Sequence, residues 1–120
     1  MTNANEELLD QYDAIGQAKL IKDGEVSSEQ LIEASISRIE SLNGPLNAVV
    51  TPMYEQALAA SRKPINTSSP LAGVPMLVKD LFAKVAGARL TEGSASLKDY
   101  ICPEDSELIR RYKKAGLIIV

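Results

Sequence analysis

Apolar residues recur at helical spacing near the start of the chain and predict two helices there. Asp13 suits the N-cap of the first helix, which ends at Gly24, where a left-handed backbone costs little. Ser27 and Gln30 form a capping box for the second helix, whose isoleucines follow helical spacing. We expect this second helix to pack one stripe of side chains on a core and to stop at residues 43–45, Asn-Gly-Pro.

The middle of the chain predicts a strand, a helix and a loop in succession. Residues 47–51 are β-branched at their centre, which indicates a short strand, and Pro52 suits the first residue of a following helix. That helix is expected over residues 53–62. Residues 66–70 have the composition of turns, and we interpret them as a surface loop rather than a domain linker.

Two apolar runs in the last part of the chain predict buried strands. Residues 74–78 suit a strand covered on both faces. Residues 117–120 are expected to form a strand that is cut off before its exit turn, because a free carboxylate is costly in a core. Residues 87–96 indicate a loop that approaches another group closely. Asp105 is expected to cap a helix that stops at Gly116 and buries Leu108, Tyr112 and Ala115.

The order of these elements predicts an α/β fold, with a sheet covered by helices. At 120 residues and 45% hydrophobic content, the chain fits one small domain or part of a larger one, with a flexible start over residues 1–11. A net charge of −3 offers no basic excess for direct contact with nucleic acid. With neither a secretory signal nor an apolar run of about 20 residues, we expect a soluble, cytoplasmic protein with no membrane partner.

The candidate chemistry narrows to one lysine. The chain has no histidine, which excludes a Ser/His/Asp triad within it and removes the usual zinc ligands. No phosphate-binding fingerprint is present either, so we expect neither a metal nor a cofactor. Cys102, the single cysteine, is better explained as a packing residue than as a nucleophile. Lys79 remains, at the end of the apolar run over residues 71–78.

Two interpretations of Lys79 are open from the residues alone. Lys79 can mark the end of a strand where the chain reaches water, which physical reasoning favours because most lysines are solvated. Alternatively, it lies at the carboxyl end of a buried strand, where ligands of α/β sheets bind. Desolvation there would favour the neutral amine, which could act as a base without histidine.

Several stretches resemble, in order, the amino-terminal region of the amidase signature family. They are residues 24–31, 38–43, 46–49, 70–80, 91–94, 105–111 and 115–120. The most specific is G-V-P-x-x-V-K-D over residues 73–80, which contains Lys79. The resemblance extends from about Tyr12 to the last residue.

The resemblance implies a serine hydrolase of carboxylic amide bonds, with a mixed sheet covered by helices. The family uses a nucleophilic serine, a second serine with a cis peptide bond, and a lysine, which Lys79 matches. Neither serine has a matching context here, so residues 1–120 correspond to an N-terminal fragment of a single domain, truncated before the catalytic serines and the oxyanion hole. We expect no appreciable activity from this chain alone. Asp80 is expected to be a hydrogen-bonding or charge partner, and Gly73 and Gly93 to shape the backbone.

Three functions remain open. The first is hydrolysis of a small-molecule amide. For this function, the full-length protein could be a homodimer. The second is the A subunit of a glutamyl-tRNA(Gln)-type amidotransferase, although residues 105–112 look closer to general amidases. The third is a non-catalytic binding module or pseudo-enzyme that uses the cleft near Lys79 or the apolar end at Val120. The amide substrate is not identified, since the family builds its pockets largely from later parts of the chain.

Overall fold

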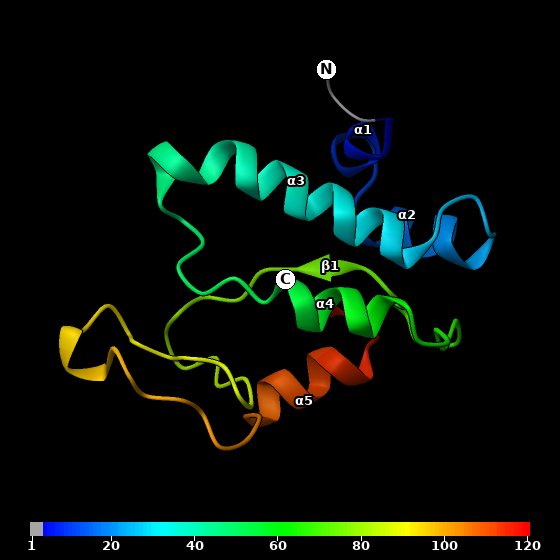
Figure 1. Cartoon of the computed structure of the whole chain (residues 1–120). Helices are drawn as coiled ribbons and strands as arrows, with labels where there is room; N and C mark the ends of the chain where they lie inside the picture. The colour runs from blue at the N-terminus through cyan, green and yellow to red at the C-terminus, as the bar shows by residue number, and fades with distance from the viewer. Residues whose placement is uncertain (1–3) are drawn as a thin grey trace.

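The computed structural model describes residues 4–120, which fold into helices around a short parallel sheet (Figure 1). The elements are α1 (Ala4–Gln11), α2 (Ala14–Lys22), α3 (Ser28–Leu46), α4 (Tyr54–Ser61), β1 (Pro75–Met76), the 3-10 helix η1 (Ala95–Leu97), α5 (Glu107–Lys114) and β2 (Ile118–Ile119). The strands pair in parallel, with Pro75 opposite Ile118 and Met76 opposite Ile119. Figure 1 places α1 to α3 on one side of the strands and α5 on the other.

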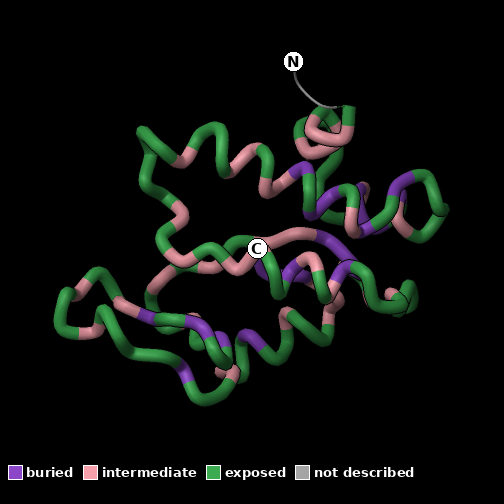
Figure 2. The backbone as a smooth tube through the Cα atoms, in the orientation of Figure 1, coloured by how far each residue is buried: buried purple, intermediate pink, exposed green. Residues whose placement is uncertain are grey.

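Neighbouring residues of β2 face opposite sides of the sheet, as the pleat of a strand requires. Ile118 packs with Ile32 of α3 and Ala57 of α4. Ile119 packs with Ile109 of α5. All five side chains are buried, and Figure 2 shows by contrast that the outer loop around η1 is largely exposed. Helices therefore cover both faces of a small sheet, which confirms the predicted α/β arrangement in outline.

The capping signals of α2 and α3 form the hydrogen bonds that the sequence predicts. The Asp13 carboxylate accepts a hydrogen bond from the Gly16 backbone N–H at 2.8 Å. Ser27 Oγ accepts from the Gln30 N–H, and Gln30 Oε1 accepts in return from the Ser27 N–H. Gly24 follows α2 with φ of 75°, the left-handed conformation expected of it. Both helix starts are therefore confirmed.

The end of α3 and the segment after it differ from the prediction. The helix does not stop at residues 43–45 but includes Pro45 and ends at Leu46, before Asn47, whose φ of 48° is left-handed. Asn43 Oδ1 accepts hydrogen bonds from the backbone N–H groups of Ala48 and Val49, both at 2.8 Å. These bonds fold the chain back on the helix end, so residues 47–51 form no strand, and the strand prediction there is wrong.

Helix α4 begins later than predicted, and residues 66–70 form turns. Its N-cap is Met53, without a side-chain hydrogen bond, so Pro52 lies outside the helix rather than at its first residue. The helix ends at Ser61, close to the predicted end. The prediction of a surface loop over residues 66–70 is confirmed by its turns and by its mostly exposed residues.

The two strands are short, and only one is buried as predicted. Both residues of β2 are buried, which confirms a strand within residues 117–120. The predicted strand over residues 74–78 reduces to Pro75–Met76, which are half-buried, and Leu77 is exposed. The Ile118 N–H donates to the Val74 carbonyl at 2.9 Å and the Val120 N–H donates to the Met76 carbonyl at 3.1 Å.

Helix α5 has a different cap and a different buried face from those expected. Ser106, not Asp105, is the N-cap, and its Oγ accepts a hydrogen bond from the Ile109 N–H. Ile109 is fully buried, whereas Leu108 is about half exposed, so the predicted stripe is wrong at Leu108. Gly116 ends the helix as predicted, with φ of 98°.

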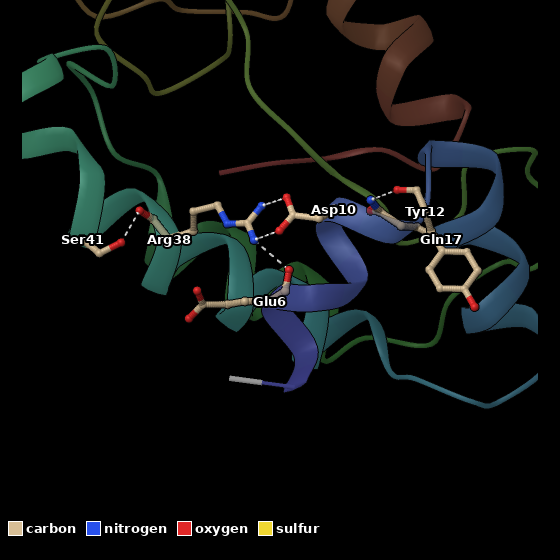
Figure 3. Close-up of polar contacts among 6 residues, drawn as sticks. All are labelled: Glu6, Asp10, Tyr12, Gln17, Arg38 and Ser41. Carbon is tan, nitrogen blue, oxygen red and sulfur yellow. Dashed lines mark hydrogen bonds and ion pairs between the residues drawn. The ribbon is translucent and has the colours of Figure 1, made fainter. Parts of the chain in front are cut away.

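Residues 4–11, where a flexible start was expected, form α1, which packs on α3 (Figure 3). Arg38 of α3 holds both carboxylate oxygens of Asp10, at 2.8 and 2.9 Å. The same guanidinium donates to the backbone carbonyl of Glu6 at 2.8 Å. The expectation for residues 1–3 lies outside the described residues.

Candidate active site

A cavity of about 440 Å³ lies beside the carboxyl end of β1. Its walls come from four parts of the chain: most of residues 48–53, residues 77–81 with Ala83 and Val85, most of residues 88–93, and the last two residues. Lys79 is on this wall, together with its neighbour Asp80. The wall is largely apolar, with a few charged groups, as is typical of sites for small organic ligands.

The parallel pairing of β1 with β2 brings Lys79 to this cavity. The Ile118 N–H donates to the Val74 carbonyl at 2.9 Å, and the Val120 N–H donates to the Met76 carbonyl. Beyond Met76 the chain leaves the sheet and enters the cavity wall. Lys79 thus lies just past a strand end, which both interpretations expected. Its side chain is exposed in residues 4–120, which agrees with the solvated strand end, and the burial that the alternative interpretation expects is not found there.

Asp80 is the most strongly bonded polar side chain on the cavity wall. Its Oδ1 accepts from the Thr91 N–H at 2.7 Å and from the Glu92 N–H at 3.4 Å. Its Oδ2 accepts from the Thr91 hydroxyl. Partial burial alone would raise the pKa of Asp80, but these hydrogen bonds and the nearby Arg89 charge outweigh it and hold that pKa below its ordinary value. The expected role of Asp80 as a hydrogen-bonding partner is confirmed.

The loop opposite Lys79 is held by backbone contacts that the sequence analysis missed. Arg89 pairs with Ile101 in an antiparallel bridge and donates from its guanidinium to the Val50 carbonyl at 3.2 Å. This contact ties residues 47–51 to the loop. Thr51 Oγ1 is buried and has no hydrogen-bond partner within residues 4–120. No local sequence pattern predicts the contacts of Arg89, or those of Thr91 with Asp80. The resemblance over residues 91–94 was the one signal that pointed to this part of the loop.

Gly73 and Gly116 allow the close approach of the segments that lead to the site. Gly73 has φ of 79°, and a Cβ there would lie 2.9 Å from Ser28 Cβ and Oγ. Ser28 Oγ donates to the Gly73 carbonyl at 2.7 Å and so connects α3 to the start of β1. A Cβ on Gly116 would lie 2.6 Å from Ala72 Cα. The expected backbone role of Gly73 is confirmed, and Gly93 also has a left-handed φ, 71°.

Other candidate groups lie outside the cavity. Cys102 is buried, as expected of a packing residue, and its N–H donates to the Ala88 carbonyl at 2.9 Å. In the described part of the chain, His, Cys, Asp and Glu side chains form no group of three that could hold a metal ion. Among the helices of residues 4–120, none is long and apolar enough to cross a membrane.

Comparison with known proteins decides the family. The family model described as Amidase matches residues 30–120. The chain belongs to the amidase signature family. Amidase signature relatives include the 6-aminohexanoate-cyclic-dimer hydrolase of Pseudomonas sp. (strain NK87), which is 34% identical over 110 residues, 90% of this chain and 22% of the relative. The A subunit of the glutamyl-tRNA(Gln) amidotransferase of Alkalilimnicola ehrlichii is 37% identical over 108 residues, 86% of this chain and 22% of that relative.

Solved structures of amidase signature enzymes have the same fold over nearly the whole chain. The structure of a 6-aminohexanoate cyclic dimer hydrolase complexed with substrate matches with a TM-score of 0.82 and 34% identity, covering 91% of this chain and 22% of that chain. The chain therefore spans about a fifth of the length of the relatives that it matches. The fold of residues 4–120 is that of an amidase signature enzyme over this fifth.

Proposed function

We propose that this chain is the amino-terminal part of one amidase signature domain and that Lys79 is the lysine of its Ser/cis-Ser/Lys site. The full-length protein would hydrolyse the carboxylic C–N bond of a small-molecule amide. The observation that carries the proposal is the position of Lys79 on a cavity wall, just beyond a strand end, in a chain of this family. The catalytic serines and the oxyanion hole belong to the remainder of the protein.

The proposed chemistry gives Lys79 one task, which is to hold and move a proton. A neutral amine takes the proton of the bridging serine, which in turn activates the nucleophilic serine for attack on the amide carbonyl. Lys79 is exposed in residues 4–120. The proposal therefore requires later residues to cover Lys79, exclude water and place the serines against it.

The test is substitution of Lys79 in the full-length protein. Lys79→Ala should lower kcat for amide hydrolysis by at least about 10²- to 10⁴-fold, the usual contribution of a positioned general base. Lys84→Ala is the matched control, because Lys84 is also exposed but lies outside the cavity wall. Both variants should keep the circular dichroism spectrum of the parent. Retained activity in Lys79→Ala would remove Lys79 from the catalytic role.

The proposal also requires that residues 1–120 alone show no appreciable amide hydrolysis. Removal of a nucleophile or an oxyanion donor costs orders of magnitude in rate. The fragment and the full-length protein are compared on the same amide substrate at equal concentration. Turnover by the fragment at a rate near that of the full-length protein would contradict the truncation.

A second candidate is the A subunit of a glutamyl-tRNA(Gln)-type amidotransferase. It is favoured by relatives of that class, one of which has 37% identity, against 34% for the cyclic-dimer hydrolase. The two functions differ in what the protein requires. A member of an amidotransferase complex would co-purify with companion subunits and release ammonia from glutamine. A free amidase would hydrolyse amides without companion subunits, as a monomer or as a homodimer.

A further inference from the structure

The segment that carries Lys79 has little backbone support of its own. The β1–β2 ladder ends at the Met76 carbonyl. Beyond Met76, residues 77–79 belong to no helix or strand, and residues 80–82 form an isolated turn. Lys79 therefore projects from irregular backbone, and something other than the sheet must fix its position.

Asp80 supplies the missing support through its side chain. Both carboxylate oxygens are used: Oδ1 accepts from two consecutive backbone N–H groups, of Thr91 and Glu92, and Oδ2 accepts from the Thr91 hydroxyl. Hydrogen bonds to an ionised acceptor are stronger than neutral ones. The pKa of Asp80 is held below its ordinary value by the same bonds despite partial burial, so the carboxylate is ionised at neutral pH.

The other end of this connection is well anchored. The Leu90 side chain is buried, and its N–H donates to the Tyr100 carbonyl at 3.1 Å. The Ser94 N–H donates to the Thr91 carbonyl at 2.8 Å. The Gly93 N–H donates to Thr91 Oγ1. Thr91 thus belongs to a compact turn that follows the buried Leu90. Asp80 connects the irregular segment that carries Lys79 to this turn.

We infer that Asp80, through Thr91, is a positioning residue for Lys79, in that it holds the backbone from which the lysine reaches into the cavity. This inference rests on the proposed function. Lys79 and Asp80 are adjacent in sequence and both line the same cavity. A displacement of about 1 Å in a reacting group can lower a rate about 10²-fold. Asp80 itself touches no reacting atom; it acts by limiting where the amine of Lys79 can be.

The test compares kcat and KM of variants of the full-length protein. Asp80→Ala should lower kcat about 10²-fold while KM changes only a few-fold. Asp80→Asn retains an acceptor for the two N–H groups and can donate to Thr91 Oγ1, so it should recover most of kcat. Asp99→Ala, an exposed carboxylate in the same loop region, is the matched control and should match the parent.

Thr91 provides an independent pair of variants that does not alter the carboxylate. Thr91→Val removes the hydroxyl at almost constant volume and should lower kcat, about 10-fold, whereas Thr91→Ser keeps the hydroxyl and most of kcat. The double variant Asp80→Ala/Thr91→Val should be no slower than Asp80→Ala alone, because both changes remove one connection. Additive losses would overturn the inference. This pair decides the question even if Asp80→Ala fails to fold.

Failure of the inference can be distinguished from failure of the proposed function. If Lys79→Ala remains active, the proposed function fails and Asp80 has no lysine to position. If Lys79→Ala is inactive but Asp80→Ala and Thr91→Val keep the parent kcat, the inference alone fails. If the variants lose only stability, measured as a lower unfolding temperature with an unchanged kcat below it, Asp80 is structural and the inference is overturned.

Discussion

The helical region, residues 13–46, and the site loop, residues 77–106, are held in place by different interactions. The helical region closes on a buried cluster of Leu20, Val26 and Leu31, and its helix starts are capped by neighbouring residues. Apart from η1 and one bridge, the site loop has no regular element. Carboxylates fix it by accepting hydrogen bonds from distant backbone N–H groups. Both regions bury apolar side chains, since Val85 and Ala88 of the site loop pack with Ile109 and Ile119, but the site loop is additionally held by hydrogen bonds to ionised carboxylates.

The largest effect is expected from a cavity in the helical region. Leu31 is fully buried, so Leu31→Ala should lower the free energy of unfolding by about 2–5 kcal/mol. Leu42→Ala on the same helix is the control, since Leu42 is about half exposed and its loss should cost within about 0.5 kcal/mol. Urea unfolding measures both. Equal effects would mean that the buried cluster does not dominate this region.

A smaller effect is expected at the junction of β2 with the segment before β1. Gly116→Ala would place a Cβ 2.6 Å from Ala72 Cα on a left-handed backbone, and should cost about 1–3 kcal/mol. The same change at Gly44, in α3, meets no atom within 4 Å other than its chain neighbours; its helical gain is opposed by the following Pro45, so stability should change by less than about 1 kcal/mol. Thermal unfolding should therefore shift much more for Gly116→Ala than for Gly44→Ala. Equal shifts would contradict the close approach.

Within the site loop, loss of the Asp105 carboxylate should affect the mobility of the nearby backbone more than the stability of the whole fold. Its Oδ1 accepts from the Ala86 N–H at 2.8 Å, and its Oδ2 accepts from Lys113 Nζ at 2.7 Å. Asp105→Ala should cost about 1–2 kcal/mol and speed amide hydrogen exchange at Ala86. Glu104→Ala, at an exposed neighbour, should leave that exchange rate unchanged. An unchanged rate at Ala86 in Asp105→Ala would show that the loop is held by other contacts.

The smallest expected effect is the dependence of stability on acid pH. Partial burial opposes ionisation of Asp80 and Asp105, but hydrogen bonds and nearby cations hold both pKa values below the ordinary 3.8. A pKa lower in the folded state gives stability that is fully present above the unfolded value and is lost as pH falls through the folded pKa. Stability should therefore drop as pH is lowered from about 4.

The double variant Asp80→Asn/Asp105→Asn should lose less stability over this pH range than the parent does. Asp99→Asn provides a carboxylate control in the same loop. Urea unfolding at several pH values between about 5 and about 3 gives the slopes. Identical slopes for the parent and the double variant would show that other carboxylates set the acid limit.

The sequence predicted the helical region better than the site loop for physical reasons. The Ser27–Gln30 box is formed by residues three apart, so local sequence suffices to place a helix start. The end of α3 was mispredicted because Asn43 bonds to residues beyond the helix, a contact that depends on the path of the returning chain. Residues 47–51 have strand composition, yet within the described chain the sheet consists of β1 and β2 alone, so these residues pair with no strand.

For the candidate site, the sequence indicated where Lys79 lies relative to the strand but not the contacts of its neighbours. The apolar run before Lys79 was enough to place the lysine at a strand end. Its exposure agrees with the interpretation that physical reasoning favoured, since most lysines are solvated. The partnership of Asp80 with Thr91 joins residues eleven apart across an irregular loop, where no periodic pattern applies. The resemblance to a family singled out Lys79 as a candidate; the structure was needed to find the hydrogen-bond partner of the neighbouring Asp80.

The parallel pairing of β1 with β2 has a consequence for the order of folding. Pro75 meets Ile118 and Met76 meets Ile119 only after a long loop has closed, whereas α2 and α3 form through contacts within a few residues. Loops of this length close at an entropic cost that helices avoid, and non-local parallel pairing is slow to form. During synthesis from the amino terminus, the helices can form first. The wall that carries Lys79 can take its final place only once the last residues of β2 have arrived.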